Sequence, residues 1–273
     1  MREYLCFGII GNFPNHLNQA GEAKDFASTS DVDTPKGLFP FYVPNCDSFL
    51  GRYCIDNDVI IIPNDNKNYN VQAEPEICLE CDVSYDSGKV AALNPKFFFA
   101  FNDVSIRNYD GAAKLSQKKN FSKASKGCGC KISIDKFDNG GVCDNFSLTS
   151  FLLFDEELHQ YGDNAKLVDY TYFYKKLIYW TIEQLNTQTD KFVLENLINI
   201  IKRSNYPSKI LIAAGATSYT NIGEERFLQN GDEICIVSYN HNQYSNEDIK
   251  NLIKNGAKKI EGASVVRQKV LIK

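Results

Sequence analysis

The sequence predicts an α+β fold that is mostly β, and two observations lead to this class. The first half of the 273-residue chain consists of short apolar or alternating runs bounded by Gly, Pro, Asn and Asp, which is typical of strands and turns. The second half carries apolar and aromatic residues at helical spacing. Neither an internal repeat nor a linker interrupts the chain, so we expect one domain that spans residues 1–273.

Five strands are expected in the first half, each bounded by turn residues: residues 5–10, 37–44, 59–63, 72–83 and 96–107. A turn at residues 86–88 separates the last two. The polar segment at residues 15–26 is expected to form one or two helical turns.

The second half predicts two adjacent helices, one over residues 169–185 and one that Asp190 caps and that runs to about residue 203. A strand and a glycine-bearing loop follow from residue 209. The turn at residues 230–232 (NGD) leads into another strand, because Gly and Asn tolerate positive φ. Ser245 and Asp248 form a capping box that opens a last helix.

The charge balance excludes a basic surface field. The formal net charge is −4, so we expect no nucleic-acid partner and no attachment to anionic lipid. The basic run at residues 117–126 is the one exception. It is either a solvated loop or a site for an acidic small molecule.

The expected location is the cytoplasm. No segment reaches the roughly 18 apolar residues that a membrane span needs, and the N-terminus has no signal-peptide pattern. Nine unevenly spread cysteines argue against a disulfide framework and for reduced thiols. A zinc site that uses Cys128, Cys130 and Cys143 is the alternative for three of them.

Residues 72–80 (QAEPEICLE) place several acids on one face of a strand. Side chains alternate in a strand, so Glu74, Glu76, Cys78, Glu80 and Asp82 point the same way. This face is either the solvated side of an ordinary strand or a set of carboxylates that converge on a cation.

Asp103 continues a face that carries Phe97, Phe99 and Phe101, and it is therefore expected to be buried. A buried carboxylate needs a cation or strong donors beside it. Arg107 is one candidate partner. A metal ion shared with Glu74 and Glu76 is the other.

The order of several motifs resembles that of the fumarylacetoacetate hydrolase superfamily, from about residue 7 to residue 238. The matching segments are residues 11–16 (GNFPNH), 35–44 (PKGLFPFYVP), 74–77 (EPEI), 102–107 (NDVSIR), 125–127 (SKG), 212–217 (IAAGAT) and 230–232 (NGD). The resemblance implies a rolled mixed β-sandwich with peripheral helices, and a homodimer.

The resemblance also implies a divalent ion, Mg²⁺ or alternatively Mn²⁺ or Ca²⁺, held by Glu74, Glu76 and Asp103. The residue types agree, since an all-oxygen carboxylate set suits a hard cation. The implied activity is metal-dependent hydrolysis of a carbon–carbon bond in a small 2-keto acid or 1,3-dicarbonyl, through a metal-stabilised enolate. Isomerase, hydratase or decarboxylase activity on the same substrates would share that enolate.

Further roles follow from the resemblance. His16 is the implied base for water, Lys126 would neutralise developing negative charge or bind a substrate carboxylate, and Arg107 would brace the metal site and contact substrate.

Three positions depart from the family pattern. Gln19 replaces an acid, with Glu22 as the nearest carboxylate; the motif arginine is missing after Gly11; and Ala216 replaces a threonine, with Thr217 beside it as the substrate-contact candidate. An amide cannot accept a proton, so a non-catalytic metal-binding protein is the alternative function.

Overall fold

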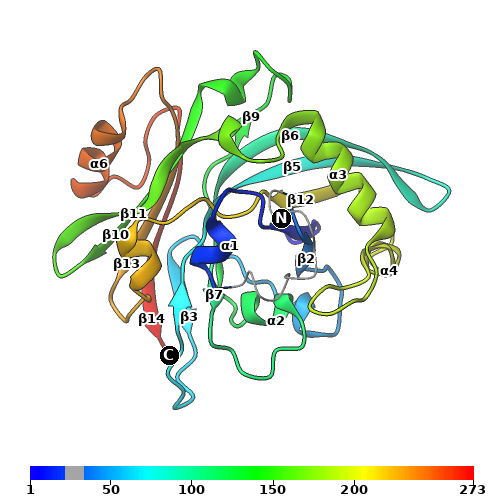
Figure 1. Cartoon of the computed structure of the whole chain (residues 1–273), viewed down its shortest axis with the longest axis horizontal. Coiled ribbons are helices and arrows are strands. Elements are labelled where there is room, and N and C mark those ends of the chain that lie inside the picture. Colours follow the sequence, from blue (N-terminus) through cyan, green and yellow to red (C-terminus); the bar gives the residue numbers. More distant parts are fainter. Residues whose placement is uncertain (22–33) are drawn as a thin grey trace.

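Two mixed sheets and one two-stranded ribbon hold the strands of the computed structural model, which describes residues 1–21 and 34–273 (Figure 1). The first sheet has the order β2 (Gly37–Tyr42), β1 (Leu5–Ile10), β12 (Lys209–Ala213), β5 (Pro75–Asp86), β6 (Lys89–Asp103) and β8 (Lys126–Cys128), and β9 (Ile132–Ser133) also pairs with β6. The second sheet has the order β11 (Glu157–Lys166), β10 (Phe146–Phe154), β13 (Glu233–Asn240), β14 (Ser264–Ile272) and β3 (Val59–Ile62). The ribbon pairs β4 (Val71–Gln72) with β7 (Ser105–Ile106).

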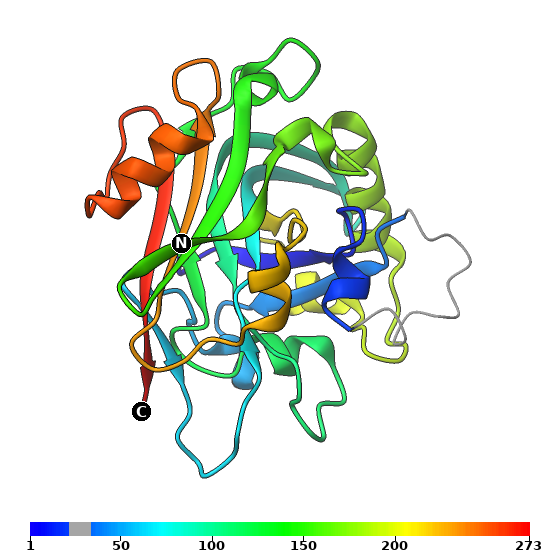
Figure 2. The same cartoon turned by 60° about the vertical axis from the view of Figure 1, so that its left-hand side comes forward.

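The helices are short and lie around the sheets (Figure 2). They are α1 (His16–Gln19), α2 (Leu115–Lys119), α3 (Tyr174–Thr187), α4 (Leu197–Arg203), α5 (Asn221–Glu225) and α6 (Asn246–Lys254). Within residues 1–21 and 34–273, 3₁₀ turns cover Phe49–Gly51, Val142–Asn145 and Leu167–Asp169. The helices α3 and α4 lie together on one side and α6 on the opposite side (Figure 1). The predicted α+β class with peripheral helices is confirmed.

The main core lies between the two sheets. Phe98 of β6 meets Phe146 of β10 with ring centroids 5.0 Å apart, edge to face. The other face of the first sheet buries a second cluster that includes Phe99 and Phe101. A third cluster covers the outer face of the second sheet, where Ile249 of α6 is fully buried. Burial on both faces explains why β6 is apolar on both sides from Phe98 to Phe101.

The long β5–β6 hairpin sets the position of the acidic residues. Glu76 pairs with Phe101 and Cys78 pairs with Phe99 in the antiparallel register. Residues that pair directly across two strands point to the same face. The acidic face of one strand and the phenylalanine face of the other are therefore one surface, which lies inside the curl of the first sheet.

The helices of the second half differ from their predicted bounds. The helix expected over residues 169–185 begins at Tyr174, after a 3₁₀ turn, and ends at Thr187. The Asp190 cap is wrong, because Asn196 caps α4 with its side-chain oxygen on Asn199 N at 3.0 Å. Asp190 instead pairs with Lys114 Nζ at 2.8 Å. The capping box of Ser245 and Asp248 is confirmed. Part of the segment at residues 15–26 forms α1, and residues 22–26 lie outside the described part.

All nine cysteines are free thiols, and the predicted absence of a disulfide framework is confirmed for them. Cys128, Cys130 and Cys143 form no group of metal-ligating atoms in the structure as described over residues 1–21 and 34–273. This arrangement gives the zinc alternative no support.

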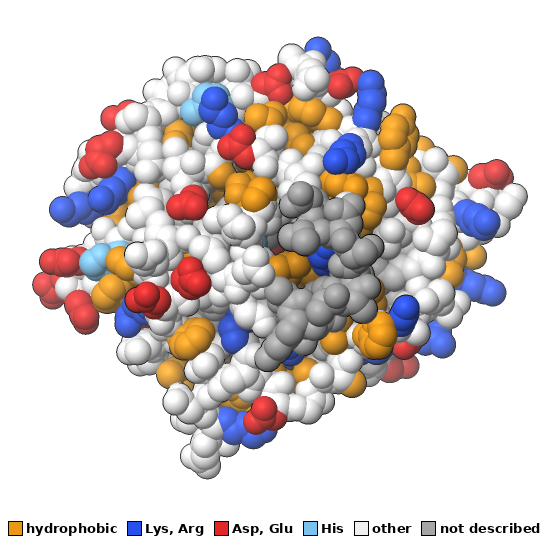
Figure 3. All heavy atoms as spheres, viewed as in Figure 1, with side chains coloured by type: hydrophobic (Ala, Val, Ile, Leu, Met, Phe, Trp, Pro, Cys, Tyr) orange, Lys and Arg blue, Asp and Glu red, His pale blue; other side chains and the backbone are white. Residues whose placement is uncertain are grey.

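The surface has charges of both signs. On the face drawn in Figure 3, basic and acidic side chains are interspersed over the described residues. Among the helices of the described ranges, none is both long and apolar enough to cross a membrane.

Candidate metal centre

Three carboxylates converge where β5 begins and β6 ends. Glu74 precedes β5, Glu76 is its second residue, and Asp103 is the last residue of β6. Asp103 N donates to Glu74 O at 3.1 Å, which places the two side by side. One carboxylate oxygen from each of the three lies within 4.8 Å of the others, and no residue of the three is more than 3% exposed. Strand alternation places Glu74 and Glu76 on one face, and the structure brings them together with Asp103, the third residue that the resemblance implies.

Two lysines offset the negative charge of this cluster. Lys119 Nζ lies 2.5 Å from Glu74 Oε2 and 2.8 Å from Asp103 Oδ2. Lys126 Nζ lies 2.8 Å from Asp103 Oδ1. Both lysines are almost completely buried, which is rare unless the ammonium is paired.

Arg107 forms an ion pair with Glu74. The prediction that Arg107 pairs with Asp103 is wrong. Its Nη2 lies 2.9 Å from Glu74 Oε1. Its Nε donates to Gln72 Oε1 at 2.7 Å, and Nη2 also donates to the Tyr219 hydroxyl at 3.1 Å. These bonds hold both the guanidinium and the Glu74 carboxylate in place from behind the cluster.

Glu76 has no ion pair within the described part of the chain. Its Oε2 accepts a hydrogen bond from Gly215 N at 2.9 Å. Gly215 adopts φ of 99°, a conformation that favours glycine and that directs this amide at the carboxylate. Burial, and then the charge of Asp103, raise the pKa of Glu76 well above its ordinary value. The cluster thus holds one carboxylate that its own cations do not neutralise.

The donor set fits a divalent cation. Three carboxylates from three different residues supply only oxygen atoms, as Mg²⁺, Mn²⁺ and Ca²⁺ prefer. An added cation would favour the ionised form of Glu76, which burial disfavours in its absence. Glu74, Glu76 and Asp103 are the residues that would hold the ion.

His16 is the first residue of α1 and is 4% exposed. Its Nδ1 lies 3.0 Å from Thr217 O, and a carbonyl oxygen can only accept, so Nδ1 carries the proton in this contact. In the neutral ring Nε2 then keeps its lone pair, and it lies 3.9 Å from Glu74 Oε2. The imidazole therefore presents a proton acceptor to the carboxylate cluster.

Gln19 has a different partner from the acid that the resemblance implies at its position. Its Nε2 donates to Tyr219 O at 3.0 Å and its Oε1 accepts from Tyr219 N at 2.9 Å. It therefore fixes the loop that carries the Thr217 carbonyl, and through this loop it orients His16. Glu22, the other acid considered for this role, lies outside the described residues.

Thr217 is buried beside the cluster, at 1% exposure. Its backbone N–H and its hydroxyl both donate to Pro75 O, at 3.0 and 3.4 Å. Ala216, in the place of the family threonine, is also buried. This loop lies next to the start of β5. Glu74 directly precedes this strand and Glu76 is its second residue.

The sequence alone does not indicate a role for Lys119. In the basic run at residues 117–126, no regular spacing distinguishes Lys119 from Lys118 or Lys123. The structure ends α2 at Lys119 and buries it to 3% exposure, so the interpretation of the run as a solvated loop is wrong at Lys119 and Lys126.

Glu80 does not lie on the solvated side of an ordinary strand, which was one of the two interpretations of the acidic face. It is 2% exposed, and it pairs with Lys131 and, at 3.6 Å, with Lys209 Nζ. The reason is the strand order, since β12 pairs with β5 and brings Lys209 alongside. Asp82, one pair further, is partly exposed and also contacts Lys209 at 2.9 Å.

Comparison with solved structures identifies the fold. The chain is similar to 2-keto-3-deoxyarabinonate dehydratase (TM-score 0.55, 14% identity, 98% of this chain and 73% of the other). It is also similar to 5-carboxymethyl-2-hydroxymuconate delta-isomerase from Mycobacterium smegmatis (0.53, 14%, 98% and 79%). A yeast fumarylacetoacetate hydrolase family protein matches as well (0.55, 12%, 99% and 94%).

These likenesses confirm the predicted fumarylacetoacetate-hydrolase-like fold, and at such low identity they establish the fold alone. The search of curated protein sequences found no significant match. Residues 22–270 match a family described as a family of unknown function, DUF5718. Since the match covers most of the sequence, the chain belongs to the DUF5718 family.

Proposed function

We propose that this protein is a divalent-metal-dependent enzyme that cleaves a carbon–carbon bond in a small 2-keto acid or 1,3-dicarbonyl by hydrolysis. The observation that carries the proposal is the buried cluster of Glu74, Glu76 and Asp103 with His16 Nε2 facing it, 3.9 Å from Glu74 Oε2. The names of two similar structures support this substrate class, because one is named for a 2-keto acid and the other for a carboxymethyl-hydroxymuconate.

In this proposal the metal is Mg²⁺, or alternatively Mn²⁺ or Ca²⁺. Bound to the three carboxylates, the ion would polarise the substrate carbonyl oxygens and offset the charge of the enolate that leaves. His16 Nε2 would accept a proton from the attacking water while Nδ1 keeps its hydrogen bond to Thr217 O. The Thr217 carbonyl, which Gln19 positions, replaces the missing acid as the group that orients the ring.

The two lysines would have different roles. Lys126 has its ammonium on Asp103, on Lys119 O and near Ser125, all in a fully buried setting. We propose that it neutralises charge by holding Asp103. Lys119 lies between Glu74 and Asp103, and we propose that it contacts the substrate carboxylate once a metal ion occupies that position. Arg107 would brace Glu74, and Thr217 would line the substrate site.

Isomerase, hydratase or decarboxylase activity on the same substrates is the close alternative, since each passes through an enolate. A non-catalytic metal-binding role is the second candidate, and Gln19 is the observation that favours it. Its amide is engaged with Tyr219 and cannot relay a proton.

The test is turnover of acylpyruvates and oxaloacetate with Mg²⁺ or Mn²⁺, for the native chain and for Asp103→Asn. Glu80→Gln is the matched control, because Glu80 is a buried carboxylate on the neighbouring strand β5 and lies outside the cluster. We expect activity that EDTA and Asp103→Asn abolish and Glu80→Gln retains. Activity that EDTA and Asp103→Asn leave unchanged would refute the metal-dependent mechanism. Metal binding without turnover over the whole panel would favour the non-catalytic role.

We also propose that the chain folds as one domain over residues 1–273, acts in the cytoplasm and assembles as a homodimer. Nine free thiols fit a reducing compartment. Light scattering after size exclusion tests the assembly, with twice the chain mass of 30.9 kDa expected and a single chain mass contradicting it.

A further inference from the structure

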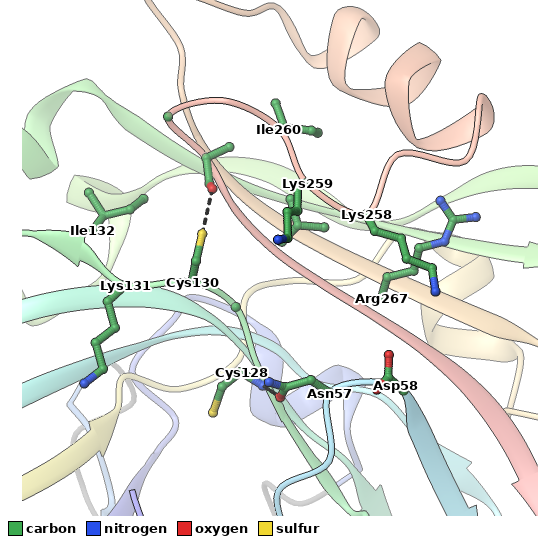
Figure 4. A pocket seen from close by; sticks show the side chains of 14 residues that line it. Asn57, Asp58, Cys128, Cys130, Lys131, Ile132, Lys258, Lys259, Ile260 and Arg267 are labelled. Carbon is green, nitrogen blue, oxygen red and sulfur yellow. Dashed lines mark hydrogen bonds between the residues drawn. The ribbon is translucent and has the colours of Figure 1, made fainter.

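A second cavity lies apart from the carboxylate cluster and has no role in the proposed reaction (Figure 4). Its volume is about 720 Å³, within the range that holds small-molecule ligands. Three segments line it: residues 57–58 before β3, residues 128–132 from the end of β8 to the start of β9, and the loop after α6 together with the start of β14.

Hydrogen bonds between these segments hold the walls of the cavity together. Cys128 N donates to Asn57 Oδ1 at 2.8 Å. The Cys130 thiol donates to Ala263 O at 3.0 Å, which Figure 4 marks, and Ser264 Oγ donates to Cys130 O at 2.6 Å. The cavity is therefore preformed, and a ligand would not have to order the loops when it binds.

The lining has an excess of positive charge, although the chain as a whole has a net charge of −4. Lys131, Lys258, Lys259 and Arg267 line the cavity, against one acid, Asp58. Two of these cations are already paired outside the cavity, Lys131 with Glu80 and Arg267 with Glu233.

The other two lysines have no ion pair within residues 1–21 and 34–273. Figure 4 shows Lys258 and Lys259 on the loop after α6, across the cavity from Asn57 and Asp58. The two ammonium groups and the Asp58 carboxylate together leave a net charge of +1 at the cavity.

Apolar side chains supply the rest of the surface. Ile132 and Val265 are partly buried, and Ile260 and Ala263 are buried. A cavity with an apolar wall and a localised pair of ammonium groups matches a ligand that has a short carbon skeleton and an anionic end.

We propose that this cavity is a binding site for a small molecule that carries a carboxylate or phosphate group. The ammonium groups of Lys258 and Lys259 bind the anionic group, and the apolar wall contacts the carbon skeleton. The site is separate from the proposed metal centre and does not depend on the proposed activity.

Calorimetric titration of the metal-free, full-length protein with succinate and, separately, inorganic phosphate tests this site and distinguishes the two kinds of anion. The test variant is Lys258→Ala/Lys259→Ala, in which both changed side chains are exposed. The control is Lys254→Ala/Lys269→Ala, which removes the same charge from exposed positions in the same region but outside the lining. We expect the test variant to bind the preferred anion roughly five- to tenfold more weakly, as for two partly exposed charge contacts, and the control to bind like the native chain.

Alkylation of Cys130 by iodoacetamide gives a readout at the cavity itself, with Cys46→Ser removing the other thiol that is not buried. The better-binding anion should slow this alkylation in the native lining and not in the Lys258→Ala/Lys259→Ala variant. The proposal is overturned if neither anion binds, if the test and control variants bind equally well, or if binding leaves the alkylation rate of Cys130 unchanged.

Discussion

Glu76→Gln should stabilise the metal-free protein and remove its response to a divalent cation. Glu76 is 2% exposed, has no ion pair in the described part of the chain, and lies beside two other carboxylates. A glutamine has nearly the same shape, and its side-chain oxygen can still accept from Gly215 N, which bonds Glu76 Oε2 at 2.9 Å. The substitution therefore removes charge repulsion and the cost of burial while it keeps the packing.

The expected gain without metal is about 1–3 kcal/mol, the desolvation cost of a buried polar group, because the one hydrogen bond from Gly215 N offsets the cost of burying the charge only in part. For a chain of this length each kcal/mol moves the melting temperature by about 2–4 °C. The gain depends on pH. Because the pKa of Glu76 is raised in the folded state, its protonated form stabilises the fold below its unfolded pKa of about 4.3, and this stabilisation is lost as pH rises through the folded value. The advantage of glutamine should be absent near pH 4.5 and present at neutral pH.

A divalent cation should reverse the order of stability, so that the native protein becomes more stable than Glu76→Gln. The native protein should gain about 2.7 kcal/mol at a cation concentration one hundred times Kd, and Glu76→Gln should gain little. The assay is thermal unfolding in EDTA and in Mn²⁺ at neutral pH, with Glu80→Gln as the control. That control loses the pairs with Lys131 and Lys209, so it should melt lower in both conditions and keep the full response to Mn²⁺. A Glu76→Gln protein that is less stable than the native chain in EDTA and responds equally to Mn²⁺ would refute this reasoning.

Three further predictions concern residues around the cluster and in α6. Lys119→Met should bind Mn²⁺ roughly tenfold more tightly, because in the native chain the Lys119 ammonium competes with the ion for Glu74 and Asp103. The variant should also lose turnover. Calorimetry measures the affinity, and weaker Mn²⁺ binding would contradict this prediction. His16→Asn should lower kcat by about 10²–10⁴ and retain Mn²⁺ affinity, and an unchanged kcat would show that another group is the base. Ser245→Ala should cost about 1 kcal/mol and lower the melting temperature by about 2–4 °C equally with and without metal, since it removes only the cap of α6; a metal-dependent change would contradict this.

Strand periodicity leaves two interpretations of the acidic face open, and the resemblance to the superfamily selects Glu74, Glu76 and Asp103 as the predicted metal ligands. Glu74 and Glu76 share a face at a spacing of two, and Asp103 continues a phenylalanine face. The sequence therefore predicts the face of the strand to which each of these side chains points. The pairing of Glu76 with Phe101 then turned two separate faces into one surface. That pairing follows from the hairpin between β5 and β6, which a turn signal at residues 86–88 indicates.

Lys119 and Glu80 could not be predicted in this way. Lys119 ends a five-residue helix in a run with several lysines, and only its tertiary contacts distinguish it from Lys118. Glu80 is buried because β12, more than a hundred residues later in the chain, brings Lys209 beside it. The prediction that Asp190 caps α4 was wrong for a local reason. Asp190 and Asn196 are both good capping residues, and the helix begins only after the turn that lies between them.

The most direct test of the central claim is a crystal structure of the protein soaked in Mn²⁺, with anomalous data. The account predicts one strong peak whose centre lies about 2.0–2.6 Å from carboxylate oxygens of Glu74, Glu76 and Asp103, with Lys119 Nζ moved away from its present contacts. No peak at the three carboxylates, with Lys119 still between Glu74 and Asp103 at saturating Mn²⁺, would contradict it.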